Sequence, residues 1–255
     1  MAFPPVVHEP FASVRFGRVL FVELAPGPPA GSRCRYCRVL SGDPPPGRTH
    51  FSEPGAALRA ILSPLEHGAA VDAVVLGGVG DPLRHRAAGS ILRNLRTRAH
   101  VATVVLSDGI LLGDRDTRRD AGEADTVAAW LPPLRVPGTS GRVAALRREE
   151  LFGRHVEGLA ALRRETPARI ALEIPVGPQS GGVKENREAW ARTAERIRAD
   201  RVLVLPAPGF EGDDVPAALE EVRRELPHHA GMFLPDGTPP DTRCFCDDVG
   251  TDEAD

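Results

Sequence analysis

Residues 71–83 read Val71-Asp-Ala-Val-Val-Leu-Gly77-Gly-Val-Gly-Asp81-Pro-Leu83, and this stretch indicates the fold of the chain. Its first six residues form an apolar run rich in β-branched side chains, and the glycines that follow end it. A helical pattern then covers residues 86–98. A buried strand, a glycine turn and a helix together make one unit of a parallel α/β fold.

The same unit recurs along the chain. Strands are predicted at residues 19–24, 71–76, 101–106, 125–130, 169–174 and 201–205, and helices at residues 52–66, 86–98, 113–122, 142–165, 184–199 and 215–226. Six units in strict alternation predict an α/β fold, a partial (β/α)6 TIM-like barrel, with an open doubly wound sheet as the alternative. In either architecture the loops that follow the strands share one face, where ligand sites cluster.

The units define one predicted domain with a short segment at each end. Residues 1–12 are proline-rich and predicted to be irregular, and residues 13–230 form the α/β domain. Ser52 is the candidate N-cap of the first helix. Residues 231–255 form a tail that contains a possible short strand at 231–234, the motif Cys244-Phe-Cys246 and an acidic end.

Composition excludes several classes of protein. The chain has 255 residues, 42% of them hydrophobic and 26% charged, as expected of a soluble globular protein. A net charge of −3 argues against a general nucleic-acid sheath or a binder of anionic membranes, although a local basic groove stays open. Lys184 is the only lysine, so arginine runs such as Arg147-Arg148 and Arg163-Arg164 are predicted to be solvated helix faces. Without a secretory signal or an apolar run of membrane-spanning length, we expect a cytoplasmic protein and no membrane partner.

Cys34-x-x-Cys37 lies in the long loop at residues 25–50, directly after the first strand. Two thiolates at this spacing can bind one metal from a single turn. Four cysteines in a reducing compartment also favour metal binding or redox chemistry over disulfides. The alternative is a pair of ordinary thiols.

The surrounding pattern resembles the radical S-adenosylmethionine (radical SAM) superfamily. That family carries C-x3-C-x2-C after its first strand, often with an aromatic residue before the last cysteine; Cys34, Tyr36 and Cys37 match, whereas Ala30 stands at the first cysteine position. Arg15-Phe-Gly-Arg18 resembles the lead-in of a subgroup that includes wybutosine-synthesis enzymes. The resemblance implies a [4Fe–4S] cluster and S-adenosylmethionine as cofactors.

Two further turns carry the resemblance. Residues 77–83 are similar to the family's G-x-G-E-P-x-L motif with Asp81 for glutamate, and Ser107-Asp108-Gly109 is similar to its T-N-G turn. The family's first motif holds the amino group of the cofactor's methionine part, and an acidic residue could stabilise an ammonium there. The cofactor-binding residues so implied are Tyr36, Gly77, Gly78, Gly80, Asp81, Ser107, Asp108 and Glu173.

Some of these residues also have simpler interpretations. Both glycine-containing segments are good turn sequences without any chemistry. Glu173 is the one charge inside an apolar strand, and it either faces ligand from the barrel interior or pairs with an arginine. His85 and His155 lack ligand-like spacing and are predicted on the surface, while His228-His229 is a weak metal candidate.

Three functions remain open because alanine cannot ligate iron. In the first, a tail cysteine, Cys244 or Cys246, replaces the missing ligand, and the chain is a radical SAM enzyme that generates a 5′-deoxyadenosyl radical with an external electron donor and an unknown substrate. In the second, Cys34, Cys37, Cys244 and Cys246 close a four-thiolate site for zinc or a structural iron–sulfur cluster. In the third, the scaffold binds no metal and serves as a partner protein. The subgroup resemblance hints at a nucleic-acid substrate, which the charge does not support.

Overall fold

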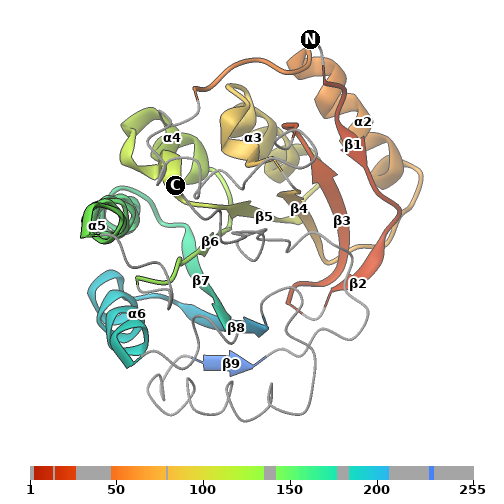
Figure 1. Cartoon of the computed structure of the whole chain (residues 1–255). Helices are drawn as coiled ribbons and strands as arrows, with labels where there is room; N and C mark the ends of the chain where they lie inside the picture. Colours follow the sequence, from red (N-terminus) through yellow and green to blue (C-terminus); the bar gives the residue numbers. More distant parts are fainter. Residues whose placement is uncertain are drawn as a thin grey trace, which may run out of the picture.

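A single mixed sheet organises the part of the chain that the structure, a computed structural model, describes (Figure 1). The described residues are 3–13, 15–26, 47–78, 80–134, 142–176, 184–206 and 230–232. Six parallel strands lie side by side in chain order. They are β3 (Gly17–Glu23), β4 (Ala73–Gly77), β5 (Ala102–Ser107), β6 (Thr126–Trp130), β7 (Arg169–Val176) and β8 (Arg201–Pro206).

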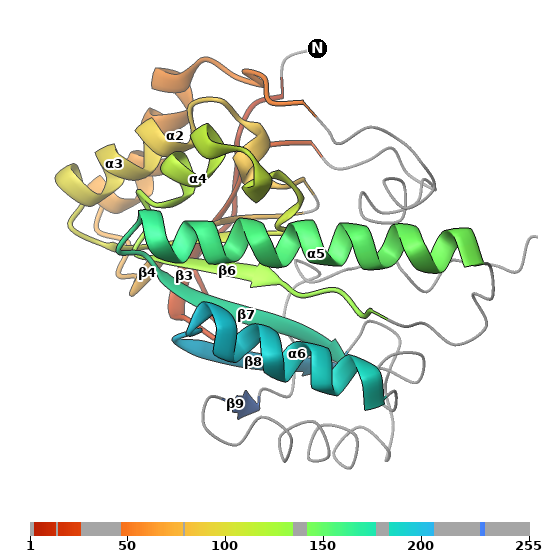
Figure 2. The same ribbon diagram turned by 90° about the vertical axis from the view of Figure 1, so that its left-hand side faces the viewer.

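A helix follows each of the first five parallel strands and returns the chain to the start of the next. These helices are α2 (Pro54–Glu66), α3 (Ala88–Arg98), α4 (Arg115–Ala121), α5 (Arg142–Glu165) and α6 (Lys184–Ile197). They lie outside the arc of strands in Figure 1, and Figure 2 shows α5 and α6 running alongside β6, β7 and β8. Since the strand order never reverses within the described residues, the sheet is not doubly wound.

The two faces of the sheet bury different sets of side chains. On β3, Leu20 and Val22 join the large cluster that packs against the helices, whereas Val19 and Phe21 join a smaller cluster on the inner face. Successive side chains of a strand point to opposite faces. Burial on both faces explains why these strands are near-continuous apolar runs in the sequence.

The N-terminal residues differ from the prediction. Within the segment 1–12 that the sequence predicts to be irregular, β1 (Val6–Val7) pairs antiparallel with β3, and β2 (Phe11–Ser13), which extends one residue past this segment, does the same. These short strands cover the edge of β3, which would otherwise expose unpaired backbone groups. At the opposite edge of the sheet, β9 (Ala230–Met232) pairs parallel with β8. It begins one residue before the predicted strand at 231–234.

Local details also differ at the start of α2. Glu53 caps this helix, since its carboxylate accepts hydrogen bonds from the backbone of Gly55 and Ala56, so the prediction of Ser52 as N-cap is wrong. Short 3-10 turns, η1 (Pro82–Arg84) and η2 (Ile110–Gly113), follow β4 and β5. The predicted helix at 215–226 lies outside the described residues. None of the described helices is both long enough and apolar enough to cross a bilayer.

Candidate functional site

The candidate site lies at the carboxyl ends of β3, β4 and β5. Three segments leave the sheet there: Ala25–Pro26 after β3, the glycine turn at 77–81 after β4, and Ser107–Gly109 after β5. Neighbouring parallel strands necessarily bring these segments to one edge. The turn after β4 contacts both of the other segments: Gly80 packs on the backbone of Ala25 and Pro26, and Asp81 bonds to Ser107 and Asp108.

Asp81 joins the turn after β4 to the turn after β5. Its carboxylate is buried and accepts hydrogen bonds from the Ser107 hydroxyl (2.7 Å), the Asp108 backbone N–H (3.1 Å) and the Leu83 backbone N–H (2.8 Å). The Ser107 oxygen in turn accepts from the backbone N–H of Gly109 at 3.0 Å. Asp81, Ser107 and Asp108 therefore form one hydrogen-bonded group that fixes the relative position of the two turns.

Two glycines let the turn after β4 approach β3 closely. Gly78 has a φ of +104°, and a Cβ atom there would lie 2.5 Å from Cγ of Glu23. A Cβ atom on Gly80 would overlap the backbone carbonyl oxygens of Ala25 and Pro26, which have no freedom to move aside. This turn therefore packs directly on the backbone that leads into the cysteine segment.

Both ends of the cysteine segment are attached to the residues that follow the glycine turn. On the outgoing side, Arg84 donates a hydrogen bond to the carbonyl oxygen of Pro26 at 3.1 Å. On the returning side, Arg48 donates to the Leu83 carbonyl at 2.9 Å, and Thr49 exchanges backbone hydrogen bonds with Arg84 and Arg86, each 2.9 Å long. The chain thus leaves and re-enters the described structure beside residues 83–86.

The predicted metal ligands themselves lie outside the described residues. They are Cys34, Cys37, Cys244 and Cys246, together with Tyr36, Ala30 and the pair His228-His229. Among the residues that are described, no three metal-ligating side chains come together.

Glu173 lies on the inner face of β7 and pairs with an arginine. Its carboxylate accepts a hydrogen bond of 2.6 Å from the guanidinium of Arg15, and both side chains are buried. Arg15 belongs to the turn between β2 and β3, and in a flat sheet β3 and β7 would be about 19 Å apart. The ion pair therefore requires the sheet to bend around its inner face, as Figure 1 also shows.

Two histidines predicted on the surface are buried. The ring of His85 accepts a hydrogen bond at Nδ1 from the Ala87 backbone N–H, and Nε2 lies 3.3 Å from the Ser52 hydroxyl. Burial and the neighbouring His50 lower the pKa of His85. The prediction failed because single histidines carry no spacing signal, whereas their burial depends on tertiary contacts.

His155 lies under the turn after β5, where its ring contacts Gly109. Neither ring nitrogen makes a well-formed hydrogen bond to the described residues, and the Trp130 backbone is near enough only to oppose weakly, with Asp108, the burial that lowers the pKa of His155 from 6.5 to about 4. A signal was present in the sequence: His155 shares one helical face with Phe152, Val156 and Leu159.

Two residues at the site were missed entirely. Glu23, the last residue of β3, places its side chain against Gly78, and the ring of His8 lies 3.0 Å from a Glu23 carboxylate oxygen. The same ring contacts Phe21 of the inner-face cluster edge-on. Sequence reasoning could not find this pair because it depends on the antiparallel pairing of β1 with β3.

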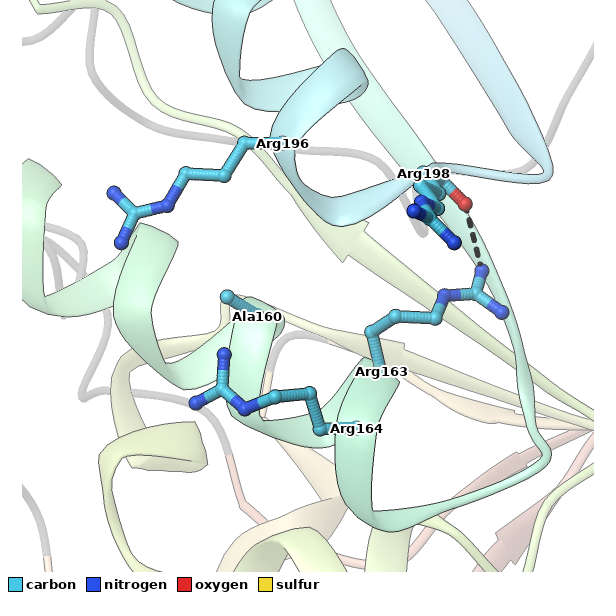
Figure 3. A pocket seen from close by; sticks show the side chains of 5 residues that line it. All are labelled: Ala160, Arg163, Arg164, Arg196 and Arg198. Atoms are coloured by element: carbon cyan, nitrogen blue, oxygen red, sulfur yellow. Dashed lines mark hydrogen bonds between the residues drawn. The ribbon is translucent and has the colours of Figure 1, made fainter.

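A hollow lies between the carboxyl-terminal ends of α5 and α6. It has a volume of about 450 Å³ and is lined by Ala160, Arg163, Arg164, Arg196 and Arg198 (Figure 3). Arg163 donates to the carbonyl oxygens of Ile197 and Arg198, so it caps the end of α6 instead of belonging to a solvated face. Cations at helix carboxyl ends offset the helix dipole, which accounts for this cluster structurally.

Comparisons with known sequences give two relatives and no family. No family model matches the chain. The chain is 26% identical to UPF0026 protein slr1464 of Synechocystis sp. over 97% of its own length and 89% of that protein's length. It is 20% identical to the GTPase Obg of Brachyspira hyodysenteriae over 86% of its length, but it spans only 32% of that protein.

A solved structure gives the more direct comparison. A radical SAM methyltransferase from Sphaerobacter thermophilus superposes with a TM-score of 0.63, covering 94% of this chain and 80% of the enzyme, at 16% identity. The chain has a radical-SAM-like fold. At this identity the likeness concerns the fold alone.

Proposed function

We propose that the chain is a radical SAM enzyme that binds a [4Fe–4S] cluster and S-adenosylmethionine at the carboxyl ends of β3, β4 and β5. One observation carries the proposal: both ends of the segment that bears Cys34 and Cys37 are attached to residues 83–86, directly after the glycine turn. The segment that bears the cysteines therefore begins and ends beside the glycine turn, which supports a shared site, and the radical-SAM-like fold supports the same assignment.

The described residues fit a small, polar cofactor. Gly78 and Gly80 provide side-chain-free backbone, which a charged ligand can approach closely. Asp81 holds this turn rigidly against Ser107 and Asp108, so the binding surface is formed before the ligand arrives. When bound, the reduced cluster would supply one electron to cleave S-adenosylmethionine into methionine and a 5′-deoxyadenosyl radical, which takes a hydrogen atom from the substrate.

The fold contributes positioning and exclusion of water. We propose that the bent sheet is a partial (β/α)6 barrel, with the inner-face cluster and the Arg15–Glu173 pair as its floor. In this arrangement the buried Glu173–Arg15 pair would exclude water from the barrel interior beneath the ligand. An external electron donor would restore the reduced cluster after each turnover.

Because Ala30 replaces the first cysteine, a second function, as a closed metal site, is also proposed. With alanine at the first cysteine position, Cys34 and Cys37 supply two of the three thiolates that an open cluster needs. A third ligand from Cys244 or Cys246 would leave one iron open for S-adenosylmethionine. If both tail cysteines bind, the site is a closed four-thiolate site for zinc or a structural cluster, and the protein would act by binding a partner.

Anaerobic purification of the full chain separates these functions. Iron and zinc analysis, visible and electron paramagnetic resonance spectra with and without S-adenosylmethionine, and an assay for 5′-deoxyadenosine would be measured on the wild type and on C34S, C37S, C244S and C246S. The enzyme predicts a reducible cluster whose spectrum changes on adding S-adenosylmethionine, loss of the cluster in C34S and C37S, and loss in only one tail variant. One zinc per chain with no cleavage product would refute the enzymatic function.

A further inference from the structure

The carboxylate of Asp81 is already used inside the protein. A carboxylate offers about four lone-pair sites, and that of Asp81 accepts hydrogen bonds from Ser107, Asp108 and Leu83 while almost fully buried. The Asp81 carboxylate therefore serves to hold the turns after β4 and β5 together. A second carboxylate beside the glycine turn would have more accepting capacity for a positively polarised group bound there.

Glu23 is placed to be that acceptor. It ends β3 on the inner-face side, and its Cγ and carboxylate lie against Gly78, within 2.7 Å of where a Cβ would stand. Its side chain is 21% exposed, so solvent or a ligand at the carboxyl end of β3 can reach it. Gly78, with its positive φ, is what leaves room for it.

The partners of Glu23 leave its charge available. Glu173, the other inner-face carboxylate, is neutralised by the guanidinium of Arg15. Within the described residues, His8 is the one side chain whose pairing with the Glu23 carboxylate is seen, and the His8 side chain is 42% exposed. A neutral imidazole can donate its Nε2–H to one carboxylate oxygen and leave both the charge and the second oxygen free.

We propose that Glu23, and not Asp81, recognises the amino group of the methionine part of S-adenosylmethionine. The inference rests on the proposed function, and it assigns the specificity for that end of the ligand to a residue outside the glycine motif. The N–H groups of an amino group are donors whether it is protonated or bound to iron, and a carboxylate is their strongest acceptor in proteins. Asp81 is accordingly a positioning residue.

The test is ligand binding to the anaerobically reconstituted full chain by equilibrium dialysis. S-adenosylmethionine and S-adenosylhomocysteine carry the amino group, whereas 5′-methylthioadenosine lacks it. For Glu23→Gln, which keeps a hydrogen-bond acceptor for His8, we expect the Kd of the first two ligands to rise about 10- to 100-fold and that of the third to stay unchanged. Glu66→Gln removes one charge at the far end of α2 and is the matched control.

Each result decides the inference. Equal affinities of wild type and Glu23→Gln for S-adenosylmethionine would overturn it and leave the proposed function standing. A loss that extends to 5′-methylthioadenosine, or that spares S-adenosylhomocysteine, would also overturn it, because amino recognition predicts neither. Failure of the wild type to bind S-adenosylmethionine would instead overturn the proposed function, and the inference with it. Asp81→Asn is expected to lower the midpoint of thermal unfolding, whereas Glu23→Gln should leave it within about 2 °C.

Discussion

Removing the imidazole of His155 should flatten the dependence of stability on pH. The ring is buried beneath the turn after β5, and burial lowers its pKa from 6.5 to about 4. Between these two values the unfolded chain binds a proton at this residue and the folded chain does not. The stabilisation is therefore fully present above pH 6.5 and is lost as the pH falls toward 4.

The size of the effect follows from the shift. At about 1.4 kcal/mol per pKa unit, the full contribution is about 3 kcal/mol, of which about 2 kcal/mol is lost between pH 7 and pH 5. His155→Leu replaces the titrating imidazole with an apolar side chain of similar size. The loss of unfolding free energy between pH 7 and pH 5 should accordingly be about 2 kcal/mol smaller in this variant than in the wild type.

Urea unfolding followed by circular dichroism at both pH values measures this difference. His155→Gln is a second non-titrating variant, which guards against an effect of packing, and His67→Gln removes an exposed histidine at the end of α2 as a control. The imidazole resonance of His155 in NMR spectra should also remain that of the neutral ring at pH 5. If wild type and His155→Leu lost equal stability between pH 7 and pH 5, the reasoning would be refuted.

Three further predictions concern the backbone and one buried arginine. Gly109→Ala should lower the unfolding free energy by about 2–4 kcal/mol, because φ is +74° and the added methyl overlaps the ring of His155; Gly113→Ala, which meets no atom within 4 Å, should cost less than about 1 kcal/mol in the same urea titration. Gly80→Ala should lower both the unfolding free energy and the iron or zinc content per chain, since the added methyl would overlap the backbone carbonyl oxygens of Ala25 and Pro26 at the start of the cysteine segment; unchanged metal content would contradict this. Arg118→Lys should cost about 2–3 kcal/mol in thermal or urea unfolding, because the guanidinium makes a two-pronged bond to a glutamate of α5 and also donates to two backbone carbonyls, a set that an ammonium cannot reproduce.

The parallel strands could be predicted from sequence because their signal is local. The run predicted at 71–76 is β4 at Ala73–Gly77, and the run predicted at 201–205 is β8 at Arg201–Pro206. Burial on both faces demands unbroken apolar runs, and glycine or proline marks their ends. The meeting of Asp81 with Ser107 and Asp108 was also predictable, since it follows from parallel neighbours alone.

Other features depend on contacts between distant residues and left no local trace. Residues 6–7 become a strand only because the edge of β3 is there to pair with, and that pairing in turn brings His8 to Glu23. The sequence leaves the interpretation of Glu173 open because its partner, Arg15, lies 158 residues earlier in the chain. Ser52 looked like a helix cap, but its hydroxyl faces His85 and the following glutamate takes the cap.

The attachment of both ends of the cysteine segment lowers the entropy cost of metal binding there, which partly offsets the absence of a cysteine at position 30. In a free loop, metal binding must itself provide the entropy cost of bringing distant ligands together. Here hydrogen bonds from Arg84, Arg48 and Thr49 already hold both ends of the segment beside the glycine turn. Residues 80–86 also carry the Asp81 link to the turn after β5, so both ends of the cysteine segment and both turns belong to one hydrogen-bonded unit. If a ligand of the cysteine segment and a ligand of the turns each stabilise this unit, linkage requires that each raise the affinity for the other by the same factor.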